Sequence, residues 1–170
     1  MHTRNPSGDC QTKNKRVLVI GLGNLERSDD GVGVVIARRL KTATASCVTV
    51  RESSGDLTTL LDVWRGYDEV LLVDAMHAGD TPGKVRWFDV SESNLPEATF
   101  AEHSTHTFGL YQAIAMARAL GELPRTVLVV GVQGADFASG GVLSPEVRDA
   151  VDGIVSAILA RIDQMENTHA

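Results

Sequence analysis

The chain has 170 residues, which is enough for one domain with a sizeable buried core. Hydrophobic residues make up 43% of it and charged residues 22%, a globular balance that excludes disorder over the whole length. Its 16 basic and 22 acidic residues give a formal net charge of −6, which argues against a nucleic-acid partner because nucleic-acid-binding proteins carry a basic face. No apolar run approaches the roughly 18 residues of a membrane-spanning helix, so we expect no membrane partner.

The first residues differ in composition from the rest of the chain. Residues 1–15 contain no aliphatic side chain after Met1, so we expect a disordered tail there and a single domain over residues 16–170. This opening lacks the apolar core of a secretory signal. Cys10 and Cys47 form neither a CxxC pair nor a zinc-finger spacing, so we expect a cytoplasmic protein.

Short apolar runs rich in β-branched residues predict strands that are buried on both faces of a sheet. Such runs are residues 16–21 and 126–132, and residues 47–50 and 69–74 predict two further strands. Residues 84–90 alternate between apolar and polar side chains, which predicts an edge strand with one face in water.

Apolar residues at helical spacing predict helices between these strands. Four helices are predicted. The first follows Gly31 and has its apolar residues at Val32, Val35, Ile36 and Leu40, and the second begins at Leu57 and continues through Leu60, Leu61 and Trp64. The third covers residues 108–120, and the fourth begins after Ser144 with a proline at the first helical position. Strands that alternate with helices pair in parallel and carry helices on both faces of the sheet. The sequence therefore predicts an α/β fold, a single doubly wound domain with a mostly parallel sheet.

Three candidate residues fall beyond the predicted carboxyl ends of the strands, where doubly wound sheets bind their ligands. Asp30 follows the first strand, Asp74 ends the third, and His106 precedes an apolar helix that we expect to begin near Thr107. Each alone has a structural explanation, since an acid in a first helical turn stabilises the helix, an acid after a strand caps a turn, and a lone histidine is usually structural. Together, two carboxylates and an imidazole from three separate loops suit a divalent transition metal.

A dinucleotide site is a further hypothesis for the turn after the first strand. Gly21 and Gly23 resemble the opening of a dinucleotide-binding fingerprint. However, Glu26 occupies the third glycine position, and Asp29 and Asp30 stand where a pyrophosphate needs hydrogen-bond donors. The metal site is therefore the better interpretation of this turn.

An ordered set of motifs over about residues 16–160 carries a resemblance to a known family. The motifs are Gly21-Leu22-Gly23-Asn24, Asp29-Asp30-Gly31-Val32-Gly33, Leu72-Val73-Asp74-Ala75, Ser104-Thr105-His106-Thr107-Phe108-Gly109-Leu110, Val129-Val130-Gly131-Val132 and Leu143-Ser144-Pro145-Glu146-Val147. The chain resembles the nickel–iron hydrogenase maturation endopeptidases. This resemblance implies a doubly wound fold and a cytoplasmic protease that removes the C-terminal peptide of a [NiFe] hydrogenase large-subunit precursor after nickel insertion.

The resemblance also implies the roles of individual residues. Asp30, Asp74 and His106 match the positions that bind metal and act in catalysis, and Asp29 matches an acid with a supporting role. The expected metal is nickel supplied by the precursor, for which another divalent metal can substitute. Two mechanisms stay open: the metal activates a water and polarises the scissile carbonyl, or it serves recognition while a carboxylate acts as general base. A non-catalytic nickel-binding or delivery module with the same residues is the alternative function.

The chain departs from the family pattern after the second predicted strand. The family often has an acid followed by Gly-Gly-Thr there, whereas this chain has the run Glu52-Ser53-Ser54-Gly55-Asp56. Because this loop is expected to help select the substrate, the hydrogenase that is processed stays open.

Overall fold

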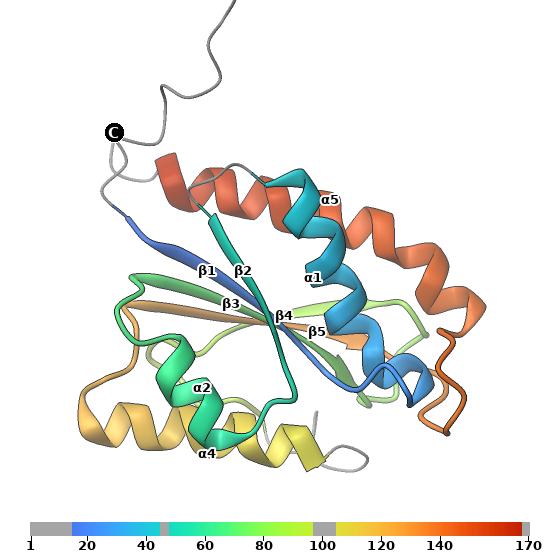
Figure 1. Ribbon diagram of the computed structural model, residues 1–170, viewed down its shortest axis with the longest axis horizontal. Coiled ribbons are helices and arrows are strands. Elements are labelled where there is room, and N and C mark those ends of the chain that lie inside the picture. The colour runs from blue at the N-terminus through green and yellow to red at the C-terminus, as the bar shows by residue number, and fades with distance from the viewer. Residues whose placement is uncertain (1–14, 45–47, 97–104, 168–170) are drawn as a thin grey trace, which may run out of the picture.

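The computed structural model describes residues 15–44, 48–96 and 105–167, with the side chains of residues 105–108 left out (Figure 1). The predicted tail lies outside the described residues except for Lys15, so its disorder stays a prediction. Lys15 is anchored to the fold, because its ammonium group donates to Glu69 Oε1 at 2.7 Å and to the carbonyl oxygen of Met165 at 3.1 Å.

Five strands form one sheet in the order β2-β1-β3-β5-β4. They are β1 (Val17–Leu22), β2 (Val48–Ser53), β3 (Glu69–Met76), β4 (Val85–Asp89) and β5 (Thr126–Gln133). β1 pairs in parallel with β2 and β3, and β3 pairs in parallel with β5. β4 lies at the edge and runs antiparallel to β5, which confirms the predicted edge strand.

Helices cover both faces of this sheet (Figure 1). They are the short 3-10 helix η1 (Ser28–Gly31), α1 (Val32–Ala43), α2 (Leu57–Val63), α4 (Thr105–Leu120) and α5 (Pro145–Asn167). α1 and α5 lie on one face, and α2 and α4 lie on the other. The structure thus confirms the predicted α/β fold with a doubly wound, mostly parallel sheet. No helix in the described part of the chain is both long and apolar enough to cross a membrane.

Two hydrophobic cores follow from the alternation of side chains along the strands. In β1, Val17 and Val19 pack beneath α1 and α5, whereas Leu18 and Ile20 pack beneath α2 and α4. All four side chains are almost completely buried. β1 is therefore buried on both faces, as its continuous apolar sequence predicts.

Helix α1 packs against the sheet through glycine. A Cβ atom on Gly33, in its first turn, would overlap the carbonyl oxygens of Val73 in β3 and Leu22 in β1. A Cβ atom on Gly21 would overlap the backbone of Gly33. This close approach sets η1 directly above the carboxyl ends of β1 and β3.

Several predicted boundaries differ from the structure by one or two residues, and two elements extend into polar segments. Helix α4 begins at Thr105 rather than near Thr107, so His106 lies in its first turn instead of in the preceding loop. β2 continues to Ser53, beyond its predicted apolar run. Both extensions consist of polar residues, which carry no hydrophobic periodicity.

Candidate active site at the carboxyl ends of β1 and β3

The order of the strands marks one position at the edge of the sheet. The chain passes from β1 to β2 on one side, and then returns to place β3 on the other side of β1. Ligands of open α/β sheets bind at such a switch in direction, beyond the carboxyl ends of the strands. Asp30 follows β1 and Asp74 lies near the end of β3, so both predicted acids lie at this switch point.

Asp30 is completely buried in η1. Its Oδ2 atom accepts a hydrogen bond of 3.1 Å from the backbone N–H of Asn24, which belongs to the turn after β1. Gly23 in this turn has a φ of +136°, and a Cβ atom there would overlap the carbonyl oxygen of Asp30. The glycine therefore lets the turn close tightly around Asp30.

Asp74 is also completely buried. Its Oδ1 atom accepts a hydrogen bond of 2.9 Å from the N–H of Ala75, and its Oδ2 atom has no hydrogen-bond partner among the described residues. Burial and, to a smaller extent, the negative charge of Asp30 raise the pKa of Asp74, the Ala75 hydrogen bond lowers it, and together they bring it to about 8. Asp74 therefore holds a proton at neutral pH.

His106 is the third predicted member of this group, and its side chain lies outside the described part. The backbone places it in the first turn of α4. Gly109, nearly one turn later, is so close to Gly55 that a Cβ atom on it would overlap the Gly55 carbonyl oxygen. Since Gly55 follows β2, this end of α4 lies at the same edge of the sheet as both acids. The described side chains contain no group of three metal-ligating residues, and the assignment of His106 stays a prediction.

Asp29 has a different environment from Asp30. It is completely buried and accepts hydrogen bonds from the loop between β5 and α5, at 2.7 Å from Ala135 N, 2.9 Å from Asp136 N, 2.7 Å from Ser144 N and 2.8 Å from Ser144 Oγ. These four donors occupy its carboxylate with protein partners. Asp29 is therefore a structural acid, in keeping with the supporting role expected for it.

Gln133 is a residue of this edge that sequence reasoning missed. It ends β5, is 2% exposed, and its Oε1 accepts hydrogen bonds from Ala78 N at 2.8 Å and Asp80 N at 3.3 Å. Gln133 thereby orders the segment that follows Asp74 and β3. The signal in the sequence was a polar residue at the end of an apolar strand.

A cavity of about 460 Å³ lies beside Asp30, at the carboxyl ends of β1 and β2. It is lined by Gly23, Asn24, Leu25, Glu26, Val34, Glu52, Ser53 and Ser54. Glu52 is held at its rim by Arg38, whose Nε and Nη2 atoms each donate to the carboxylate at 3.1 Å. The loop in which this chain departs from the family pattern thus forms one wall of a cavity next to the paired acids.

The sequence and fold are similar to those of known proteins. A sequence profile of the hydrogenase maturation proteases matches residues 34–161, which is well over half of the chain. The chain belongs to this family.

Two relatives illustrate the similarity in sequence. The hydrogenase expression/formation protein HupD of Bradyrhizobium diazoefficiens is 29% identical, over 82% of this chain and 74% of that protein. A putative hydrogenase maturation protease of Methanocaldococcus jannaschii is 30% identical, over 88% of this chain and 98% of that protein.

Two solved structures illustrate the similarity in fold. The hydrogenase maturating endopeptidase HybD of Escherichia coli has a TM-score of 0.79 at 24% identity, covering 88% of this chain and 93% of that chain. The [NiFe] hydrogenase maturation protease HybD of Thermococcus kodakarensis has a TM-score of 0.68 at 26% identity, covering 85% of this chain and 97% of that chain. This protein is accordingly a hydrogenase maturation endopeptidase, and its family favours a protease over a nickel-delivery module.

Proposed function

We propose that this protease removes the C-terminal peptide of a [NiFe] hydrogenase large-subunit precursor in the cytoplasm once nickel is in place. In this proposal, Asp30, Asp74 and His106 contact the nickel that the precursor carries. The observation that supports it is the pair of completely buried acids at the switch point, where Asp74 keeps its proton because of burial and the charge of Asp30.

The donor atoms at this position suit a divalent cation. Asp74 Oδ2 is buried without a hydrogen-bond partner among the described residues, and two adjacent carboxylates repel each other unless a cation or a proton lies between them. Carboxylate and imidazole groups together bind divalent transition metals such as nickel. His106 would supply the imidazole from the first turn of α4. The metal is part of the substrate here, so an incomplete set of protein ligands leaves room for the ligands of the precursor.

The two acids have distinct parts in the reaction. Asp74 must release its proton when the precursor's nickel binds, because a carboxylate ligates a metal in its ionised form. Asp30 stays oriented through the N–H of Asn24. When bound, nickel supplies a Lewis acid that polarises the scissile carbonyl and acidifies a water. In a second version nickel serves recognition alone, and one carboxylate of the pair is the general base for an ordinary water.

Replacing His106 tests the proposed ligand set. We expect His106→Ala to keep the folded structure and to abolish release of the C-terminal peptide from a nickel-loaded precursor. His77→Ala is the matched control, because His77 is an exposed histidine that follows β3 at the same edge and contacts the ring of Phe137. Peptide release is followed by mass spectrometry and folding by circular dichroism. Normal processing by His106→Ala would contradict the assignment.

A further inference from the structure

The two adjacent acids of η1 hold different parts of the molecule. Successive residues of a 3-10 helix point about 120° apart, so neighbouring side chains leave it in different directions. Asp30 contacts the turn after β1 through Asn24, whereas Asp29 contacts the β5–α5 loop, which we define as residues 134–144. Asp29 therefore has a structural role that Asp30 cannot share.

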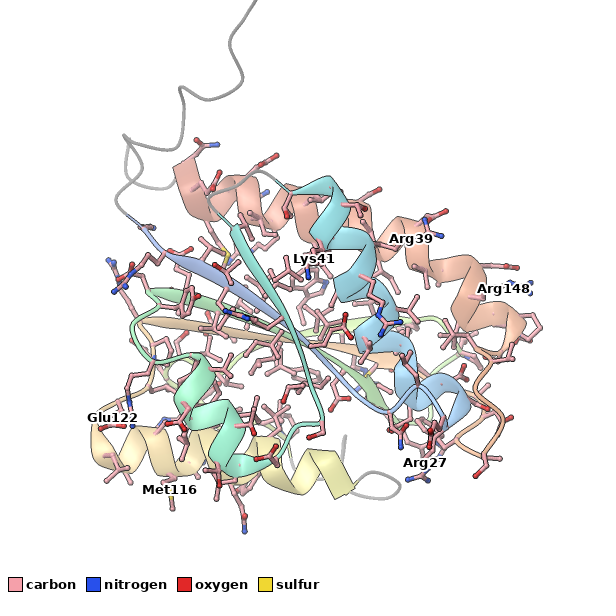
Figure 2. All side chains as sticks on the ribbon, viewed as in Figure 1. Arg27, Arg39, Lys41, Met116, Glu122 and Arg148 are labelled. Atoms are coloured by element: carbon pink, nitrogen blue, oxygen red, sulfur yellow. The ribbon has the colours of Figure 1, made fainter. Side chains whose placement is uncertain are left out.

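Asp29 is the centre of the contact between η1 and the β5–α5 loop. Its carboxylate accepts three backbone N–H groups and one hydroxyl from this loop, and its own N–H donates to the carbonyl oxygen of Asp136 at 2.9 Å. Arg27 adds a bond of 3.3 Å from its Nη2 to the carbonyl oxygen of Phe137, and it projects beside this loop in Figure 2. Nothing else on the described part of η1 reaches the loop with as many hydrogen bonds.

The β5–α5 loop is in turn fixed to the strand that carries Asp74. The N–H of Gly134 donates to the carbonyl oxygen of Met76 at 3.1 Å, and β5 pairs with β3 along its length. Asp74 lies opposite Gly131 in this ladder. Through these bonds Asp29 joins the helix that carries Asp30 to the strands that hold Asp74.

The backbone of η1 needs such support. Ser28 has a φ of +43°, a left-handed conformation that is costly for a residue with a side chain and that persists only where the surroundings hold it. Its hydroxyl donates to the carbonyl oxygen of Ala138 at 3.0 Å, again in the β5–α5 loop. The loop therefore holds η1 in a conformation that the helix would not adopt alone.

We propose that Asp29 is a positioning residue, which clamps η1 to the β5–α5 loop and so keeps the Asp30 carboxylate beside Asp74. The catalytic part of this inference rests on the proposed function. An asparagine cannot replace Asp29, because it offers one acceptor oxygen to four donors and turns its own N–H groups toward them. In Asp29→Asn, we therefore expect η1 to move away from the β5–α5 loop and to displace Asp30.

The backbone N–H of Asn24 reports this movement without any substrate, because it is the donor to Asp30 Oδ2. In Asp29→Asn we expect its amide hydrogen exchange to accelerate at least about tenfold, with a change in its chemical shift. Ser144→Ala removes only the hydroxyl bond to Asp29 and should give a smaller change of the same sign. The matched control is Glu69→Gln, which breaks the ion pair of a buried acid with Lys15 at the opposite end of β3 and should leave the Asn24 amide unchanged.

Kinetics on a nickel-loaded precursor give the second result. Misplacement of a reacting group by about 1 Å can slow a reaction about 100-fold, so we expect kcat of folded Asp29→Asn to fall at least tenfold while KM changes little. Glu69→Gln should keep kcat, although it too destabilises the fold.

Two results would overturn the inference: an Asn24 amide that is unchanged in Asp29→Asn, or a loss of kcat that Glu69→Gln shares in proportion to its loss of stability. A wild-type protein that leaves the loaded precursor uncut would refute the proposed function instead. The Asn24 amide would then decide the role of Asp29 by itself.

Discussion

Asp74 stabilises the folded protein less as the pH rises. Its pKa is about 8 in the folded state against an ordinary 3.8, so between these values the folded protein holds a proton that the unfolded chain has released. The free energy of unfolding therefore falls as the pH rises from about 4 to about 8. A residue that weakens the fold at the pH where enzymes work is typical of a functional site.

Asp74→Asn tests this pH-dependent loss of stability directly. The amide keeps the shape of the side chain and does not ionise, so the variant should gain stability over the wild type, and gain roughly 4 kcal/mol more at pH about 8.5 than at pH about 5. It should also release no peptide. Urea unfolding at both pH values measures the difference, with Asp62→Asn, an exposed acid on α2, as the control. The same gain at both pH values would show that Asp74 ionises normally.

The sequence predicted which residues lie at this site better than it predicted what each one does. Asp30 and Asp74 could be placed together because the carboxyl ends of parallel strands meet at one edge of the sheet. The separate roles of Asp29 and Asp30 could not be predicted, since neighbouring acids in one turn look alike. The donor that distinguishes Asp29, Ala135 N, lies 106 residues further along the chain.

At the scale of elements, the position of η1 depends on how closely α1 approaches the sheet. Gly33 lies against the carbonyl oxygens of Leu22 and Val73, where a side chain would have no room. Any residue with a Cβ atom must push the start of α1 away from the sheet. η1 directly precedes α1, so Asp30 would move with it.

We predict that Gly33→Ala lowers the free energy of unfolding by about 1–3 kcal/mol and slows peptide release. Gly153→Ala is the matched control, because Gly153 lies within α5, is exposed, and has open space around its Cβ position. An alanine there should stabilise the helix by about 0.5–1 kcal/mol and leave processing unchanged. Thermal unfolding and single-turnover assays measure both effects. A fully stable and active Gly33→Ala protein would contradict the close packing of α1.

The sequence predicted elements well where apolar residues repeat and less well where they do not. The strands and α1 follow from β-branched runs and an apolar stripe. The apolar stripe did not predict that Gly33 and Ala37 are buried, because these small residues add little to hydrophobic periodicity. α4 begins at Thr105, in the polar segment before its apolar run, and packs closely against Gly55 through Gly109, a contact between residues that are distant in the sequence.

At the scale of the whole molecule, Lys15 connects the start of β1 to β3 and α5. Its ammonium group is largely buried, pairs with Glu69 in β3, and donates to the carbonyl oxygen of Met165 near the end of α5. Removing one partner of a buried ion pair leaves the other charge uncompensated. The folded domain therefore includes Lys15, one residue before its predicted start at residue 16.

Two truncations test this boundary and the predicted tail together. A chain that begins at Lys15 after an initiating methionine should match the full chain in stability and processing. A chain that also lacks Lys15 should lose about 2–4 kcal/mol of stability, because Glu69 is then buried without its cation. Urea unfolding of the three chains gives the comparison. A large loss in the first truncation would show that residues 1–14 contribute to the fold.

The proposed function requires a protease that cuts only a precursor that already holds its metal. The most direct measurement is a mass spectrum of a cognate large-subunit precursor, nickel-loaded or nickel-free, before and after addition of this protein. We predict that a short C-terminal peptide is lost from the nickel-loaded precursor alone. Loss of the peptide from both forms would contradict the role given to nickel, and no loss from either form would contradict the proposed cleavage itself.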